Sequence, residues 1–178
     1  MSARSHRAAE FGPLGLIDLT RLFAAEVAVG KYPFVEYDED ERWHQRIYRD
    51  QRVDIWLISW LPSQATSLHD HGGSAGAFSV IEGQLIETVA AGHIGAGPAR
   101  PLVELARRTD DSVGFSKHYI HDVRNAGERP AVSVHAYSPP LTSMTYYDLE
   151  AGELIPIATV LTDDPEHELT AADLEAAS

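Results

Sequence analysis

The chain of 178 residues has 44% hydrophobic residues, a formal net charge of −13 and no cysteine. This length and apolar content predict one domain with a substantial core, and the negative charge argues against nucleic acid or an anionic membrane surface as a partner. Without cysteine the chain can form no disulfide and no thiolate ligand, so any metal must be bound by nitrogen and oxygen atoms. No segment is apolar over the length of a bilayer span, and the composition fits a cytoplasmic protein.

Three regions are expected along the chain. Residues 1–12 are predicted to be a flexible N-terminal arm, residues 13–162 one domain, and residues 163–178 an acidic C-terminal tail that is a weak helix or disordered. The domain is expected to begin with an amphipathic helix, because apolar residues recur there at helical spacing. These residues are Leu16, Leu19, Leu22, Phe23 and Val27, with Gly30 as the stop signal.

After an acidic linker at residues 36–41, the pattern changes to short segments of β-branched, aliphatic and aromatic residues separated by turns. Strands are expected at residues 43–50, 53–61, 79–81, 84–89, 102–106, 112–115, 131–137 and 144–149. Glu82-Gly83 predicts a hairpin turn, and residues 90–101 predict a mobile loop. Many short strands with one early helix indicate a mainly β fold, either a closed antiparallel barrel or a sandwich.

Within the first strand, Trp43, Ile47 and Arg49 are expected to share a face, because alternate residues of a strand point the same way. A cationic side chain beside apolar ones needs a partner. For Arg49 this partner is either an internal carboxylate or the carboxylate of a bound ligand.

Two histidines form the clearest candidate for a metal site. In an extended segment His69 and His71 point to one side while Asp70 points to the other, so both imidazoles can bind one ion. The third ligand must come from elsewhere in the chain. His121 is the best candidate, and His118, three residues earlier, is the alternative if the loop register differs.

Ser133, His135 and Tyr137 lie on one face of a predicted strand. A hydroxyl, an imidazole and a phenol can therefore form a hydrogen-bonded line that points into the barrel. Alternatively, these side chains form a satisfied polar network that only supports the barrel.

The segment from His69 to Gly83 resembles the first cupin motif, in which two histidines separated by one residue are followed by a glutamate and then a glycine. His121 and Asn125 resemble the end of the second cupin motif. The position of the cupin glutamate is occupied by Gly76. This resemblance implies a single-domain double-stranded β-helix barrel that holds a metal on three histidines.

A further resemblance is to the cysteine dioxygenase family of thiol dioxygenases. It rests on SLHDH at residues 67–71, SVHAYSPP at residues 133–140 and YRD at residues 48–50, and it covers roughly residues 43–148. The resemblance implies that His69, His71 and His121 bind iron(II), that Arg49 binds the substrate carboxylate, and that Ser133, His135 and Tyr137 form a relay ending at the metal. It also implies a cis Ser138-Pro139 bond.

The animal members of this family carry a cysteine at the position of Gly76, joined covalently to the tyrosine of the relay. This chain has no cysteine, so Tyr137 is expected to lack this crosslink. Gly76 is also expected to leave room for a substrate thiolate, because it has no side chain.

The first hypothesis is an iron(II) enzyme that adds both atoms of O2 to the sulfur of L-cysteine and gives cysteine sulfinic acid. The substrate sulfur and amine would fill two open metal positions and O2 the third. The second hypothesis changes the substrate to 3-mercaptopropionate or another small thiol acid. The third is a cupin that binds a metal or small ligand without catalysis. Three histidines would also accept zinc, nickel or cobalt, and the sequence sets no oligomeric state, a monomer being compatible with it.

Overall fold

The structure is a computed structural model that describes residues 9–32, 34–90, 102–165 and 167–177. The predicted N-terminal arm therefore lies outside the described residues up to residue 8, as does the predicted loop from residue 91 to residue 101. The helices are α1 (Pro13–Ala28) and α2 (Ala171–Ala177), and the strands are β1 (His44–Arg49), β2 (Asp54–Trp60), β3 (Ala75–Glu82), β4 (Gln84–Ala90), β5 (Leu102–Arg108), β6 (Ser112–Phe115), β7 (His121–Arg124), β8 (Ala131–Ser138), β9 (Met144–Glu150) and β10 (Glu153–Val160).

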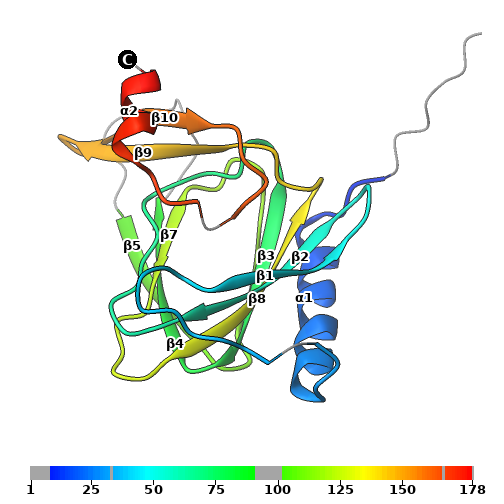
Figure 1. The fold of residues 1–178 in the computed structure, drawn as a ribbon. Helices are drawn as coiled ribbons and strands as arrows, with labels where there is room; N and C mark the ends of the chain where they lie inside the picture. Colours follow the sequence, from blue (N-terminus) through cyan, green and yellow to red (C-terminus); the bar gives the residue numbers. More distant parts are fainter. Residues whose placement is uncertain (1–8, 33, 91–101, 166, 178) are drawn as a thin grey trace, which may run out of the picture.

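The strands form a barrel from two main sheets. A five-stranded sheet has the order β1-β2-β8-β3-β6, a three-stranded sheet has the order β5-β4-β7, and β9 and β10 form a hairpin across one end of the barrel (Figure 1). All strand pairs are antiparallel. This architecture confirms the predicted mainly β cupin fold, a double-stranded β-helix barrel with an N-terminal helix. None of the helices in the described ranges is long and apolar enough to cross a membrane.

Alternate residues of the five-stranded sheet face two separate cores. On β2, Trp56 and Ile58 face the barrel interior, where they pack with side chains of β4 and β7. Ile55 and Leu57 point to the opposite side and pack against α1. Because both faces of β2 and β8 are covered, these strands are buried along their whole length.

Helix α1 lies along the outer face of the five-stranded sheet (Figure 1). Pro13 occupies its first turn, where no backbone N–H is needed, and the helix ends before Gly30, whose φ of +75° suits glycine. Leu16 and Phe23 are buried against the sheet, whereas Leu22, expected on the apolar face, is 54% exposed. The buried stripe of α1 is centred on Leu16 and Phe23, and Leu22 lies at the edge of this stripe, on the far side of Leu19.

The predicted hairpin at Glu82-Gly83 is wrong. Strand β3 pairs with β8 and β6, whereas β4 pairs with β5 and β7, so the chain passes from one sheet to the other at Gly83. Gly83 has a φ of +78°, and a Cβ built on it would lie 2.7 Å from the carbonyl oxygen of Pro130. The corner between the two sheets therefore needs glycine at this position. A hairpin turn also favours glycine, so the local sequence does not distinguish the two.

Strands β7 and β10 were not predicted from the sequence. Strand β7 is only four residues long, and β10 contains Pro156, a residue that argues against a strand interior. The structure places Pro156 at a register shift between Pro156 and Ala158, where β10 pairs with β9 alone. Proline is tolerated at such a bulge of an edge strand. The Ser138-Pro139 bond is cis, as the resemblance implies.

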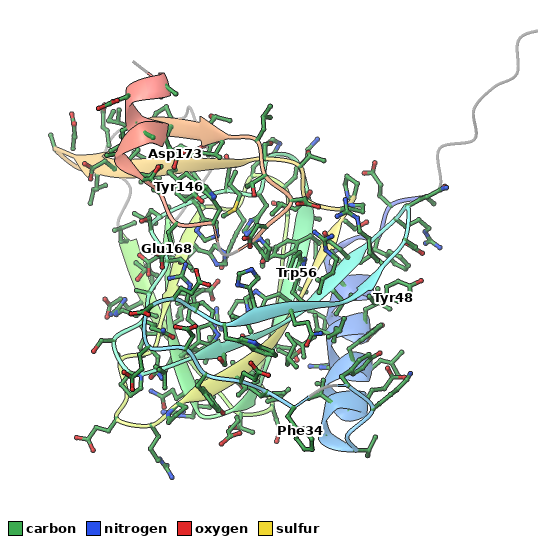
Figure 2. The ribbon with its side chains drawn as sticks, in the orientation of Figure 1. Phe34, Tyr48, Trp56, Tyr146, Glu168 and Asp173 are labelled. Atoms are coloured by element: carbon green, nitrogen blue, oxygen red, sulfur yellow. The ribbon has the colours of Figure 1, made fainter. Side chains whose placement is uncertain are left out.

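The predicted face of β1 holds for Trp43 and Ile47, which pack in the same core, but is wrong for Arg49. A bulge between Arg46 and Tyr48 shifts the alternation, so Arg46 lies opposite Trp56 and Arg49 lies opposite Asp54. Both arginines therefore share the barrel-side face of the sheet. Ile47, expected on the face of Arg49, packs on the side of α1. Figure 2 shows the same division, with Trp56 towards the barrel interior and Tyr48 at the side of α1.

The corner at Gly83 gives a stability prediction. Gly83→Ala should lower the free energy of unfolding by about 2–4 kcal/mol, because a Cβ meets both an unfavourable positive φ and the backbone of Pro130. Gly30→Ala is the matched control, since Gly30 also has a positive φ but has no heavy atom within 4 Å of the added Cβ. It should cost only about 1–2 kcal/mol. Urea denaturation of both variants measures the difference, and equal costs would contradict the packing argument.

Candidate metal centre

Three histidines from two distant parts of the chain meet inside the barrel. His69 and His71 precede β3, and His121 begins β7, where His69 and His121 exchange backbone hydrogen bonds. One nitrogen of each ring lies within 4.8 Å of the others, and all three side chains are buried. His118, the alternative third residue, is exposed and lies outside this group. We call His69, His71 and His121 the histidine group.

The hydrogen bonds of the histidine group leave nitrogen lone pairs for a metal. His69 Nδ1–H donates to the carbonyl oxygen of Ser67 (2.7 Å), and His121 Nδ1–H donates to a carboxylate oxygen of Glu87 (2.8 Å). In both rings Nε2 is then the unprotonated atom. Neither ring nitrogen of His71 has a hydrogen-bond partner among the described residues, although both are buried. A bound metal ion would satisfy one of these two nitrogens of His71. The three rings therefore fit a metal as a set of donors.

His69 and His71 have the charge state that metal binding requires. Burial is the main cause that lowers the pKa of His69 to about 3, and the neighbouring His121 adds to it. Burial, with the charges of His69 and His121, also lowers the pKa of His71 well below its usual value. Both rings are therefore neutral at neutral pH, and neutral imidazole is the form that binds metal ions.

Glu87 is a functional candidate that the sequence analysis missed. It lies on β4 with a fully buried side chain and accepts hydrogen bonds from His121 Nδ1, the Tyr119 hydroxyl (3.0 Å) and Arg107 Nε (2.8 Å). Burial acts to raise the pKa of Glu87, but His121 and Arg107 together outweigh it and leave the pKa below the usual value. An ionised carboxylate that fixes a ligand histidine is a common support of metal sites. The sequence could have indicated Glu87, because it is an acidic residue that shares a face with Leu85 in a mainly apolar strand.

Ser133, His135 and Tyr137 form a hydrogen-bonded relay along the barrel side of β8. Trp60 Nε1–H donates to Ser133 Oγ (2.9 Å), and Ser133 Oγ lies 2.9 Å from His135 Nε2. His135 Nε2 is the one acceptor among the described residues for the buried Ser133 O–H, which favours a hydrogen on the other nitrogen of His135.

The relay sets the direction of the last hydrogen bond. Burial is the first cause that lowers the pKa of His135 to about 3, so the ring is neutral and its single hydrogen lies on Nδ1. Nδ1–H then donates to the Tyr137 hydroxyl oxygen (3.3 Å). The phenol hydrogen of Tyr137 is thereby directed to a group other than His135.

A row of directly paired residues connects Arg49 with the histidine group. Across the five-stranded sheet Arg49 lies opposite Asp54, Asp54 opposite Tyr137, Tyr137 opposite Gly76, and Gly76 opposite Phe115. Side chains of directly paired residues lie on one face of a sheet. The ring of His71 stacks on Tyr137 and Phe115, with centroids 5.0 and 4.9 Å apart. We call these five paired residues of the sheet the cross-strand row.

The expectation that Gly76 leaves room for a thiolate is wrong. A Cβ on Gly76 would lie 2.3 Å from the Phe115 ring and 3.2 Å from that of Tyr137, so the ring of Phe115 fills the space beside Gly76. The sequence could not reveal this, because Phe115 comes from β6, which pairs with β3 from another part of the chain.

Arg49 has an internal partner, one of the two possibilities that the sequence left open. Its Nη1 lies 2.6 Å from Asp163 Oδ2, and Arg46 Nη2 lies 2.7 Å from the same oxygen. The Arg49 side chain is 37% exposed and that of Asp163 55%. We call Arg46 and Arg49 the arginine pair.

Asp54, also missed by the sequence analysis, is a buried carboxylate below the arginine pair. Its side chain is fully buried, and neither carboxylate oxygen has a partner at hydrogen-bonding geometry among residues in the described ranges. Burial raises the pKa of Asp54 to about 6, although the Trp56 indole and the charges of Arg49 and Arg46 act to lower it. The Trp56 indole and the two arginines therefore stabilise the ionised form of Asp54 only in part, and ionisation of this buried group costs free energy.

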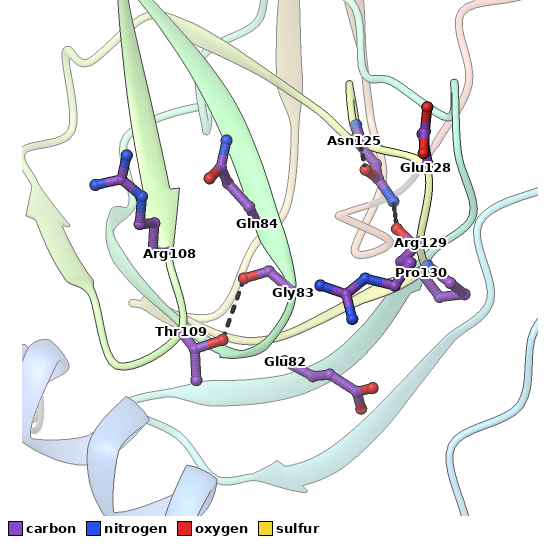
Figure 3. A pocket seen from close by; sticks show the side chains of 10 residues that line it. Glu82, Gly83, Gln84, Arg108, Thr109, Asn125, Glu128, Arg129 and Pro130 are labelled. Carbon is purple, nitrogen blue, oxygen red and sulfur yellow. Dashed lines mark hydrogen bonds between the residues drawn. The ribbon is translucent and has the colours of Figure 1, made fainter.

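A hollow of about 660 Å³ lies elsewhere, between the β3–β4 corner and the turn before β8 (Figure 3). Its lining residues in the described part of the chain include Arg108, Arg129 and Asn125, but no member of the histidine group. The Asn125 amide donates to the carbonyl oxygens of Trp60 and Arg129 (both 2.9 Å), and its own oxygen accepts from Gly127 N–H. Asn125 therefore fixes the turn after β7.

Comparison with known proteins links this geometry to one family. The family model described as cysteine dioxygenase type I matches residues 24–150. Cysteine dioxygenase type 1 of Homo sapiens is 26% identical over 114 residues, and that of Danio rerio is 28% identical over 110 residues. Each alignment covers 57% of this chain and 52% of the relative, so the chain spans about half the length of these curated relatives.

Solved structures agree on the fold. The crystal structure of the protein TT1209 from Thermus thermophilus is similar with a TM-score of 0.50 and 21% identity, over 59% of this chain and 90% of that one. At this identity the likeness supports the barrel architecture alone.

The contact between Glu87 and His121 gives a prediction about metal affinity. Glu87→Gln should weaken the binding of a divalent metal about 10- to 100-fold, because a neutral amide orients His121 less firmly and makes it a weaker donor. Glu104→Gln is the control, because Glu104 is an exposed carboxylate paired with Arg124 (2.6 Å) and the charge change is the same. Titration of the metal-free proteins with cobalt(II), followed by absorbance, measures both. An unchanged affinity in Glu87→Gln would contradict the supporting role.

The buried carboxylate of Asp54 gives a prediction about pH. Its pKa is raised from 3.8 to about 6, so the folded protein holds a proton that the unfolded chain has lost between these values. Stability therefore falls as pH rises through this window, by at most about 3 kcal/mol. Asp54→Asn should be more stable than the parent at pH 7.5, and the difference should vanish near pH 4.

Thermal denaturation across this pH range measures the effect, with Asp148→Asn as the control because Asp148 is exposed. A difference for Asp54→Asn that does not change with pH would contradict the assignment of the raised pKa to this residue.

Proposed function

Because the chain belongs to the cysteine dioxygenase type I family, we propose that it is an iron(II)-dependent thiol dioxygenase that converts L-cysteine to cysteine sulfinic acid. The main support is that the buried histidine group lies against the ring of Tyr137, in the same cross-strand row as Arg49. Tyr137 and Arg49 are thus on one face of the five-stranded sheet, and the histidine group contacts that face from inside the barrel through the stacking of His71 on Tyr137.

The metal would be held by the histidine group. When bound, iron(II) would supply open coordination positions at which a thiolate and O2 can react, so that R–SH and O2 give R–SO2H. Three neutral imidazoles add no negative charge to the ion, which favours binding of an anionic thiolate. All three rings are almost completely buried, which keeps bulk water away from the reacting atoms.

The polar relay would orient one hydrogen-bond donor at the reaction site. Trp60, Ser133 and His135 fix the Tyr137 hydroxyl as an acceptor from His135, and we propose that the phenol would donate its own hydrogen to a bound substrate. Burial of the relay keeps His135 neutral, and the direction of these hydrogen bonds therefore stays the same through the physiological pH range.

Arg49 would bind the substrate carboxylate. Tyr137 is two strands away from Arg49, which corresponds to about 10 Å between backbones. A guanidinium side chain reaching inward and a substrate as short as cysteine can together span this distance. The hydrogen bond that Arg49 Nη1 donates to the carboxylate of Asp163 (2.6 Å) supports this role.

Oxygen consumption by iron-loaded protein tests the proposal. Adding L-cysteine should consume one O2 per thiol, and mass spectrometry should identify the sulfinate. The same assay with 3-mercaptopropionate compares kcat/KM for a thiol acid without an amine. An iron-loaded protein that is inert with both thiols would favour a binding cupin instead, whereas a higher kcat/KM for 3-mercaptopropionate would change the assigned substrate.

Substitution of Arg49 tests the carboxylate contact. Arg49→Ala should raise KM for L-cysteine about tenfold, equivalent to about 1.5 kcal/mol, the low end for a charged hydrogen bond because the side chain is partly exposed. Arg52→Ala is the control, since Arg52 contacts the Ala9 carbonyl and the Phe11 ring instead. Unchanged KM in Arg49→Ala would show that the carboxylate binds elsewhere.

A further inference from the structure

Asp70, the residue before His71, receives hydrogen bonds from three donors. Its Oδ1 accepts from Gly72 N–H (2.9 Å) and Thr145 N–H (3.3 Å), and its Oδ2 accepts from the Tyr147 hydroxyl (2.7 Å). Thr145 and Tyr147 both belong to β9. One carboxylate therefore joins the turn after His71 to a strand that comes much later in the chain.

The backbone around Asp70 lies between two strands. On one side, His69 exchanges backbone hydrogen bonds with His121 of β7 (2.9 and 3.1 Å). On the other side, Asp70 N–H donates to the carbonyl oxygen of Thr145 in β9 (2.9 Å). The segment that carries two of the histidines is thus connected to the strand of the third histidine and to β9.

The side chains of this segment and of β9 divide between the two faces of the barrel wall. His69 points inward, where its ring centroid lies 6.3 Å from that of Tyr146. Asp70 and Tyr147, each the next residue in its segment, point to the opposite face and meet there. Burial, together with the hydrogen bond and the charge of Asp70, raises the pKa of Tyr147, so the phenol remains a donor at neutral pH.

His71 is the member of the histidine group whose ring has no hydrogen bond to hold it among the described residues. His69 and His121 each donate from Nδ1 to an oxygen of the protein. The ring of His71 is held instead by stacking on Tyr137 and Phe115. Its direction therefore depends more on the position of its own backbone than is the case for the other two histidines.

Asp70 fixes the backbone on both sides of His71. The acceptor at residue 70 and the donor at residue 72 enclose His71 in an Asx turn, which restricts its backbone dihedral angles. Gly72 has a φ of +55°, and a Cβ built on it would overlap Ser143 Oγ. The turn therefore packs closely against the residues that lead into β9.

Resting on the metal binding that the proposed function requires, we propose that Asp70 is a positioning residue of the metal centre. It holds the ring of His71 at the ion by fixing the turn at Gly72, and it anchors that turn to β9 through the hydroxyl of Tyr147. Asp70 points away from the ion and acts through the backbone. The ligand is a divalent transition metal bound by the histidine group, whose geometry then depends on β9.

Titration of the metal-free full chain with cobalt(II), followed by absorbance, tests the proposal without thiol or O2. Asp70→Ala should weaken cobalt(II) binding about tenfold or more. It should also change the visible spectrum of the saturated protein, because His71 is no longer held in one direction. Tyr147→Phe, which removes one of the three hydrogen bonds, should weaken binding about three- to tenfold.

Asp70→Asn separates the position of the turn from the charge of the carboxylate. The amide oxygen can still accept from Gly72 N–H, so this variant should bind cobalt(II) within about threefold of the parent protein. If Asp70→Asn weakened binding as much as Asp70→Ala, the effect would come from the lost charge, and the positioning role would be overturned.

The double variant Asp70→Ala/Tyr147→Phe tests the anchor on β9. It should bind cobalt(II) within about twofold of Asp70→Ala, because the hydroxyl acts only through the carboxylate that is already removed. If Tyr147→Phe weakened binding equally in the parent and in Asp70→Ala, the two residues would act independently, and the anchor would be overturned.

Asp50 offers a matched control at the turn between β1 and β2. Its Oδ1 accepts from Arg52 N–H (2.7 Å) and Val53 N–H (2.9 Å), and its Oδ2 accepts from the Tyr48 hydroxyl (3.2 Å). Asp50→Ala therefore removes the same kinds of hydrogen bond and should also lower Tm, but it should change cobalt(II) affinity less than twofold. Equal weakening by Asp50→Ala and Asp70→Ala would indicate a general loss of stability and overturn the proposal, as would parent affinity in Asp70→Ala.

The two proposals fail separately. If iron-loaded protein oxidises no thiol but cobalt(II) binding follows the expected pattern, the proposed function is rejected and the positioning role of Asp70 stands. If thiols are oxidised but Asp70→Ala and Tyr147→Phe bind cobalt(II) like the parent protein, the positioning role is rejected and the proposed function stands.

Discussion

The register between β2, β8 and β3 is the constraint on which the candidate site depends. It places Asp54, Tyr137 and Gly76 directly beside one another, and the pairing of β1 with β2 adds Arg49 to the same row. A shift of one residue in any of these pairs would turn a polar side chain to the face of α1, where an apolar core lies. The apolar residues that alternate with the polar ones, such as Val134 and Ala136 on β8, therefore fix the chemistry of the site by fixing the register.

The two buried carboxylates of the barrel, Glu87 and Asp54, have different surroundings. Glu87 is fully buried but receives hydrogen bonds from His121 and Arg107, so its charge is stable and serves to orient a ring. Asp54 is equally buried, and burial raises its pKa to about 6 although the Trp56 indole and the charges of the arginine pair act to lower it. A buried carboxylate with complete hydrogen bonds supports the structure. A buried carboxylate without them marks a place where the protein alone does not complete the hydrogen bonds.

Local periodicity was sufficient for much of the fold and for two members of the histidine group, His69 and His71, whereas His121 was indicated by the motif resemblance. The alternation of β8 predicted that Ser133, His135 and Tyr137 share a face, and the pair His69 and His71 followed from the same rule. Features that arise from contacts distant in sequence were not predictable. The bulge in β1, the corner at Gly83, the packing of Phe115 beside Gly76 and the support of His121 by Glu87 each depend on which strands pair, which no local pattern encodes.

The acidic composition gives Asp163 a physical rationale. A chain with a net charge of −13 repels small anions at long range, so a carboxylate site requires concentrated positive charge, which the arginine pair supplies. Two adjacent guanidinium groups also repel each other, and they need a negative group between them when no ligand is bound. The carboxylate of Asp163 meets this need from a segment 114 residues away from Arg49, with a side chain that solvent reaches. Asp163 therefore neutralises the arginine pair while remaining partly exposed to solvent, which limits the desolvation cost of this charge cluster.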